Sequence, residues 1–158
     1  PDPFVDRWSN AEMNGTFISV EGTGAECRYL CGFRNRGHGS RDASPPNYRV
    51  NFPNDRPWKG QRALNVNSER SYVQVFGATL ARMSGVAGFD SRAVQVRVNN
   101  VNLVNPAGGM YGSYAANEVY HNTWAEHHVP FDGDGNLYRA TRDLAPSDFV
   151  WRGESASA

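Results

Sequence analysis

The residues with the clearest chemical potential lie between positions 33 and 52, in the stretch FRNRGHGSRDASPPNYRVNF. A guanidinium binds phosphate or carboxylate as a fork, and glycine lets the backbone approach an anion closely. If residues 47–52 pair with residues 29–36, Arg49 comes to lie beside the glycine-bearing loop. The alternative is a surface connection whose arginines pair with nearby carboxylates. The pattern predicts a phosphate or nucleotide site made by Arg36, Gly37, Gly39, Ser40, Arg41 and Arg49.

Carboxylates and histidines later in the chain are the candidate metal ligands. The turn-rich DGDGN places Asp132, Asp134 and Asn136 at the spacing of a calcium loop, although Leu137 stands where that loop needs glycine. A glycine-rich turn is the stronger interpretation. The spacing of His121, His127 and His128 does not give an i, i+4 pair on a helix, so solvated or capping histidines are favoured over a metal site.

Composition limits the class of protein. The 158 residues carry a formal net charge of +0, which argues against a general nucleic-acid binder. Fifteen of the sixteen basic residues are arginine, since Lys59 is the one lysine. No apolar run is long enough for a membrane span.

Cys27 and Cys31 lie too far apart on one strand to form a disulfide and are expected to be buried free thiols.

The periodicity predicts the elements that must position these residues. Strands are expected over 16–20, 25–36, 47–52, 63–67, 92–98, 110–120 and 135–140, because polar and apolar residues alternate there. Asn99 and Asn100 fit a two-residue hairpin turn. A helix with Val73, Phe76, Leu80 and Met83 at helical spacing follows Ser68 or Ser71, either of which is a capping residue, and ends at Gly85 and Gly88. A short helix is expected over 122–128.

Many strands and one firm helix predict an α+β domain built on a mostly antiparallel sheet with one main α-helix. Residues 1–15 are expected to be an irregular arm, with Ser9 capping a short turn at 10–14. The domain proper is expected over 16–145, with a carboxy-terminal tail over 146–158. Four tryptophans and seven tyrosines are expected mainly to fill the core and cover its edges. A sugar-binding face is the alternative use of these rings.

The order of several short motifs resembles the CotH (spore coat protein H) kinase-like family. The stretches that carry the resemblance are RGHGSR at 36–41, PPNYRVNF at 45–52, ALNVNS at 63–68, YGSYAANEVY at 111–120 and DGNLYRA at 134–140. Two departures matter. Pro46, Asn47 and Asn51 stand where that family has lysines, and the later half that carries the family's metal-binding aspartates has no counterpart. The chain therefore resembles the amino-terminal portion of the family's atypical-kinase-like fold.

The resemblance implies phosphoryl transfer from a nucleotide (ATP) to a protein side chain, with a divalent metal. It places Glu118 among the phosphate- or nucleotide-binding residues, where it would position an arginine or a metal; the alternative is a structural ion pair. This chain alone is expected to be inactive, with the missing second half of the domain or another subunit as its partner. The alternative function is a non-enzymatic structural or adhesive module or a subunit of a larger assembly, and an extracellular or cell-surface location is favoured.

Overall fold

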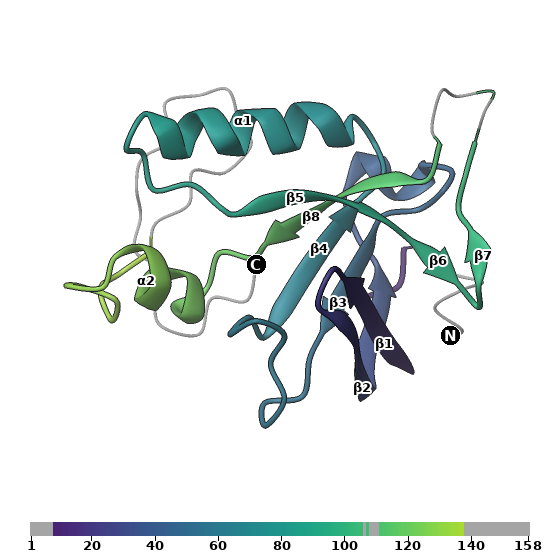
Figure 1. The fold of residues 1–158 in the computed structure, drawn as a ribbon, viewed down its shortest axis with the longest axis horizontal. Helices are drawn as coiled ribbons and strands as arrows, with labels where there is room; N and C mark the ends of the chain where they lie inside the picture. Colours follow the sequence, from purple (N-terminus) through teal and green to yellow (C-terminus); the bar gives the residue numbers. More distant parts are fainter. Residues whose placement is uncertain (1–7, 106, 108–110, 138–158) are drawn as a thin grey trace.

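A computed structural model describes residues 8–105, 107 and 111–137 of the chain. Six strands form one antiparallel sheet in the order β1-β2-β3-β4-β8-β5. The sheet curls, so that in the view of Figure 1 the β1–β2 hairpin lies below β5 and β8 and runs across their direction. The strands are β1 (Met13–Glu21), β2 (Gly24–Asn35), β3 (Tyr48–Asn51), β4 (Ala63–Asn67), β5 (Ser91–Gln95) and β8 (Ser113–Glu118). The predicted α+β class with a mostly antiparallel sheet and one main helix is confirmed.

The main helix, α1 (Ser71–Met83), connects β4 to β5 across one face of the sheet and contacts β5 and β8 (Figure 1). Because β8 pairs antiparallel with both β4 and β5, those two strands run parallel with β8 between them. This is a split β-α-β arrangement. The 3-10 turn η1 (Gly39–Asp42) follows β2, and the short helix α2 (Asn122–His128) follows β8.

The ends of α1 differ in how well the sequence predicted them. Neither predicted serine caps its start: the N-cap residue is Arg70 in the left-handed conformation, and the Ser68 hydroxyl donates instead to the Pro45 carbonyl at 2.7 Å. At the other end Gly85 has φ 74°, and the Val86 N–H donates to the Ala81 carbonyl at 3.0 Å. This is a Schellman motif, which needs a left-handed residue and so explains the glycine.

The helical periodicity of α1 predicted a helix, but the apolar residues that carry it are exposed. Phe76 is 64% exposed and Met83 is 78% exposed, and Val73 and Leu80 are also exposed. The helix packs through small and polar positions instead, because Ser71 and Ala78 are its buried residues. An apolar face of α1 is thus left in solvent.

The core lies on the opposite face of the sheet. Val50, Leu64, Val66, Tyr114 and Ala116 project from three adjacent strands, and Cys31, Phe52 and Trp58 complete the buried cluster. Phe17 packs edge-on against Phe52, with ring centroids 5.0 Å apart. The prediction that tryptophans and tyrosines fill the core holds only in part: Trp58, Tyr114 and Trp124 are buried. Most of the other described ones are exposed, namely Trp8, Tyr29, Tyr72, Tyr111 and Tyr120.

A bulge in the β1–β2 hairpin corrects the prediction for the cysteines. The register shifts between Gly15 and Phe17, and Leu30 has φ 58° on the opposite strand. The extra residue inverts the alternation of side chains along β2. Cys31 is therefore buried, whereas Cys27 is exposed, and both are free thiols.

Of the remaining predictions, the hairpin turn is confirmed, whereas several predicted segment bounds differ from the observed ones. The Asn99–Asn100 turn joins β6 (Arg97–Val98) to β7 (Val101–Asn102), and both asparagines have positive φ, as a two-residue hairpin turn requires. The strand expected over 92–98 is interrupted at Val96. The arm expected to be irregular up to residue 15 is already strand from Met13. Residues 135–137 are not in a strand, while 138–140 and the predicted tail lie outside the described residues.

Candidate functional site

Three arginines from two adjacent strands share the face of the sheet on which α1 lies, which we call the polar face. Arg34 on β2 is directly opposite Arg49 on β3, and Arg36 lies two residues further along, so that strand alternation points all three to the same side. Each is half-buried. We call Arg34, Arg36 and Arg49 the arginine cluster.

The arginine cluster is held by neutral amides rather than by acids. Arg36 donates from Nη1 to Asn67 Oδ1. Arg49 donates to Asn51 Oδ1 at 2.8 Å and to Asn65 Oδ1 at 3.4 Å. An asparagine carbonyl orients a guanidinium without neutralising it. The positive charge of these two groups is therefore fixed in place and retained.

The charge of the cluster is only weakly compensated. Within the described ranges, the one carboxylate at ion-pair distance from any of the three is Glu12, 3.6 Å from Arg34 Nε. Burial, and then the charge of Arg34, lower the pKa of Arg36. Burial, then Arg34 and Arg36, lower the pKa of Arg49, which Glu12 partly offsets. An arginine remains charged throughout, so these effects show three cations that repel one another.

A chain of side-chain hydrogen bonds links the cluster to α1. Asn67 Nδ2 donates to Gln74 Oε1 at 2.7 Å, and Asn117 Nδ2 donates to the same oxygen at 2.6 Å. Ser91 Oγ then donates to Asn117 Oδ1 at 2.6 Å. Together with the contact of Arg36 to Asn67, these bonds extend from β2 to β5. The network fixes the rotamers that hold the arginines.

Arg41 lies at the rim of the cluster and is used structurally. Its guanidinium donates to the carbonyls of Gly37 at 2.8 Å, Trp8 at 2.5 Å and Ser9 at 3.2 Å. Both Arg41 and Arg34 donate to Asn10 Oδ1, which connects the rim to the cluster. Arg41 thus ties the amino-terminal segment to the loop and lies beside Arg34 at the Asn10 oxygen that both bind.

The glycine loop folds tightly on itself. Gly37 has φ 114°, and a Cβ built there would come within 2.3 Å of Ser40 Oγ, so no other residue fits without a shift. The Ser40 carbonyl accepts from Asn47 Nδ2 at 3.2 Å, which closes the loop onto the start of β3. Gly39 has open space around it. The loop gives its two arginines different partners: Arg36 bonds to Asn67, and Arg41 bonds to backbone carbonyls.

Glu118 lies away from the arginine cluster. Leu64, its partner across β4, faces the core, whereas Asn65 faces the polar side with Arg49. Glu118 Oε2 lies 2.6 Å from His128 Nε2 and accepts from the Asp90 N–H at 3.1 Å. No arginine within the described part of the chain lies at ion-pair distance from it. Alternation along β8 separates Glu118 from the predicted phosphate site.

The calcium-like turn lies on the surface, and the metal prediction for it stays a prediction. Asp132, Asp134 and Asn136 are all exposed. The Gly135 N–H donates to the Asp132 carbonyl at 3.1 Å, which is an ordinary turn. Among the described residues, the group of three potential ligands that comes together is Glu118, His127 and His128. Sequence spacing alone missed this group, because Glu118 reaches it from a different element.

A search against models of known protein families finds no match, and neither does a search of curated proteins. The resemblance to CotH-like kinases therefore remains a prediction. Among the described residues, no helix has the length and apolar character that crossing a membrane requires.

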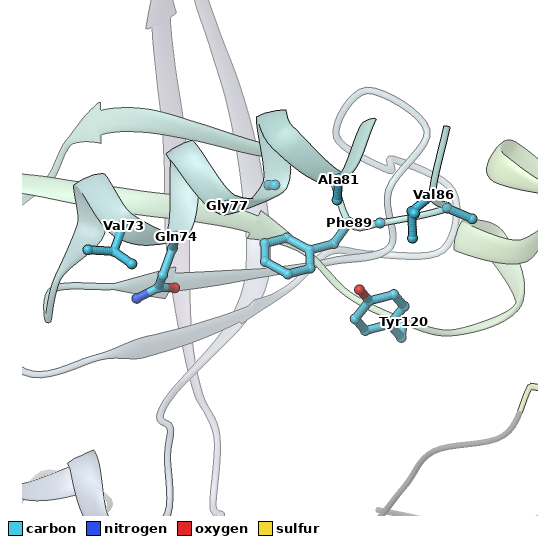
Figure 2. Close-up of a pocket in the computed structure, with 10 residues that line it drawn as sticks. Val73, Gln74, Gly77, Ala81, Val86, Phe89 and Tyr120 are labelled. Atoms are coloured by element: carbon cyan, nitrogen blue, oxygen red, sulfur yellow. The ribbon is translucent and has the colours of Figure 1, made fainter. Parts of the chain in front are cut away.

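A cavity of about 320 Å³ lies elsewhere, between α1 and residues 86–89, with Tyr120 at its edge (Figure 2). The Phe89 ring lies below the helix and meets Tyr120 edge-on, with centroids 5.8 Å apart (Figure 2). Its lining residues carry no charged side chain. Because chemistry on an anion needs cations or directed donors, we take the arginine cluster, and not this cavity, as the candidate site.

Proposed function

We propose that this chain binds the phosphate groups of a ligand on its polar face. The observation that carries the proposal is that three half-buried guanidiniums lie on neighbouring strands and, within the described residues, only Arg34 has a carboxylate at ion-pair distance, Glu12. Such a cluster is electrostatically costly without an anion, and a phosphate would relieve the repulsion while accepting several forked hydrogen bonds. Preorganisation by the asparagine amides would reduce the cost of binding.

The motif order that resembles CotH-like kinases makes ATP the first ligand to test. It also makes phosphoryl transfer to a protein the reaction to which this phosphate site would belong. Arg34 joins the predicted Arg36 and Arg49 in this assignment, and Arg41 and the glycine loop support it from the rim. Phosphoryl transfer also needs a divalent metal that bridges the phosphates. Among the described residues, the one carboxylate at ion-pair distance from the cluster is Glu12, and Arg34 already pairs with it. We therefore expect this chain to bind nucleotide without turnover.

Titration calorimetry with ATP, pyrophosphate and adenosine tests the proposal. ATP and pyrophosphate should bind and adenosine should not, and binding should weaken as NaCl rises because salt screens the interaction. Arg49→Gln should weaken ATP binding by about 10- to 100-fold, the effect of losing one hydrogen bond to a charged group. The matched control is Arg56→Gln, which removes an exposed arginine outside the cluster.

Equal ATP affinity for the Arg49→Gln and Arg56→Gln proteins would overturn the phosphate site, as would failure of the folded wild-type chain to bind either polyphosphate. Circular dichroism and thermal melting of each variant establish that a loss of binding is not a loss of fold. Measurable ATP turnover by the isolated chain would contradict the expected inactivity while leaving the binding site in place.

A non-enzymatic module or subunit is the second candidate, supported by the exposed apolar face of α1. Tyr72, Phe76 and Met83 expose most of their side chains there, and a contiguous apolar surface of this kind is typical of a contact site. Sedimentation velocity over a range of concentrations tests it: self-association that Phe76→Ser removes would favour this function. A concentration-independent monomer that binds ATP would favour the phosphate function.

A further inference from the structure

We propose that Glu118, His127 and His128 form a binding site for a divalent transition-metal ion, with Zn²⁺ as the test ion. One ligand atom from each of the three residues lies within 4.8 Å of the others. Two imidazoles and one carboxylate are a known ligand set for zinc. This site faces away from the arginine cluster, and the inference does not depend on the phosphate proposal.

The carboxylate at the centre of this group is buried and fixed. The Glu118 side chain is 3% exposed, and its Oε2 accepts from the Asp90 N–H at 3.1 Å. The Glu118 N–H donates to the Asp90 carbonyl at 2.8 Å, which holds the end of β8 in register with the segment before β5. Hydrogen bonds of this kind orient a carboxylate for a metal, as outer-shell partners do in known sites.

Among the residues that the structure describes, the buried carboxylate has no fixed cation beside it. Within the described ranges, no arginine or lysine lies at ion-pair distance from Glu118, and its side-chain partners are the imidazoles of His127 and His128. Burying a carboxylate is costly unless a cation or several donors compensate it. A divalent ion between the carboxylate and the two imidazoles would supply that compensation.

The two histidines differ in solvent exposure, which suits a metal site that an ion can enter from solvent. His128 is half-buried, and its ring stacks on Trp124 with centroids 5.2 Å apart, which fixes its orientation. His127 is 64% exposed, and its Nδ1 lies 3.9 Å from Glu118 Oε1. One ligand is therefore rigid and the other can close over an arriving ion. Both come from α2, whose adjacent residues His127 and His128 lie over the end of β8.

The spacing of the ligand atoms requires moderate side-chain movements. Bonds of about 2.0–2.2 Å in a tetrahedron place ligand atoms about 3.3 Å apart. Glu118 Oε2 lies 2.6 Å from His128 Nε2, and Glu118 Oε1 lies 3.9 Å from His127 Nδ1. The three ligand atoms lie within 4.8 Å of one another, so the pairs adjust by at most about 1.5 Å. Three protein ligands leave a fourth position for water, as in catalytic zinc sites.

Nitrogen ligands also decide which ion the site takes. Imidazole suits zinc and its transition-metal neighbours, whereas magnesium prefers an octahedron of oxygens. The site is thus distinct from the oxygen-rich magnesium sites of phosphoryl-transfer enzymes. The sequence contains no His-x-x-x-His pair, and the third ligand is ten residues before His128 on a separate element, so spacing gave no indication of it.

The experiment uses tag-free chain treated with chelator, titrated with ZnCl₂ by calorimetry and with CoCl₂ by visible absorption. We expect one equivalent of Zn²⁺ to bind, cobalt absorption bands that report a low-symmetry site with nitrogen ligands, and no heat with MgCl₂. His127→Ala removes an exposed ligand without disturbing the core and should weaken Zn²⁺ binding at least tenfold, since even outer-shell changes cost 10- to 100-fold.

The matched control is His38→Ala, which removes an exposed histidine in the glycine loop. This variant should keep the wild-type Zn²⁺ affinity. Equal affinity of wild type and His127→Ala would overturn the site, and so would an absence of Zn²⁺ binding to the folded chain. Because His127 is exposed, a folding defect is not expected, and circular dichroism checks this; Zn²⁺ should also raise the melting temperature of the wild type but not of His127→Ala.

Discussion

The two faces of the central sheet handle charge in opposite ways. On the polar face, Arg34, Arg36 and Arg49 are oriented by asparagine amides, and within the described residues the one acid at ion-pair distance from them is Glu12, beside Arg34. On the other face, Glu118 is almost fully buried and has imidazoles as its partners. The difference arises because successive side chains of a strand point to opposite sides, so that one strand, β8, separates a cationic surface from a buried acid.

The two faces also differ in what they contribute to stability. The core face buries aromatic and aliphatic side chains, and its central residue Tyr114 is 0% exposed. The polar face is joined to α1 by hydrogen bonds through Gln74. We therefore expect stability to depend most on the core face and ligand binding to depend most on the polar face.

Tyr114→Ala should produce the largest effect. The substitution empties the centre of the core and removes the hydrogen bond from Tyr114 Oη to the Pro46 carbonyl at 3.3 Å. Truncation of a buried aromatic residue costs about 3–5 kcal/mol, so urea unfolding should show a loss of this size. Tyr72→Ala on the exposed face of α1 is the control and should change the unfolding free energy by less than about 0.5 kcal/mol. Equal losses would refute the assignment of stability to the core face.

Gln74→Leu should have an intermediate effect and sharpens the description of the polar face. The variant keeps the size of the side chain but removes the acceptor shared by Asn67 and Asn117, and Asn117 is buried. Unsatisfied buried donors cost about 1–3 kcal/mol. The control, Gln95→Leu at an exposed position of β5, should be close to neutral. A neutral Gln74→Leu would mean that the network does not hold α1 on the sheet.

His121 gives the smallest effect, on the pH dependence of stability. Its Nδ1 accepts from the Thr123 N–H at 3.3 Å and caps α2. Burial, followed by the charges of Arg49 and Arg62, lowers the pKa of His121, and Glu118 partly offsets this. Because the folded-state pKa lies below the unfolded value of about 6.5, this contribution is present above pH 6.5 and is lost as the pH falls below it.

Urea unfolding at several pH values between about 7.5 and 5.5 checks this sign. The His121→Asn protein keeps a capping side chain but cannot titrate, so its stability should fall less steeply with pH than that of the wild type. The Gln95→Leu protein, which changes an exposed residue that does not titrate, should retain the wild-type slope. A steeper fall in the His121→Asn protein would show that the sign is wrong.

Sequence periodicity predicted most of the fold because strand alternation and turn chemistry are local. The segments 63–67 and 122–128 have the predicted bounds, and the Asn99–Asn100 turn forms as expected. The errors came where tertiary contacts override a local pattern. The bulge at Leu30 exposes Cys27, and the packing of α1 leaves Phe76 in solvent.

The candidate site was predicted in part. Pairing of 29–36 with 47–52 placed Arg36 and Arg49 on one face, and the same alternation indicates Arg34. The side on which Arg41 lies depends on contacts with residues 8–10, which no periodicity reveals. The partner of Glu118 likewise depends on where α2 packs, and this is not a local property of the sequence.

By itself, the sequence determined the secondary elements, the antiparallel pairing and the gathering of arginines near one glycine loop, since these follow from residue type and a period of two. The tertiary structure decided which arginines remain uncompensated and which residues meet Glu118. Those outcomes depend on how elements that are distant in the chain pack within a few ångströms of one another. A bulge of one residue, or a different position of one short helix, changes them.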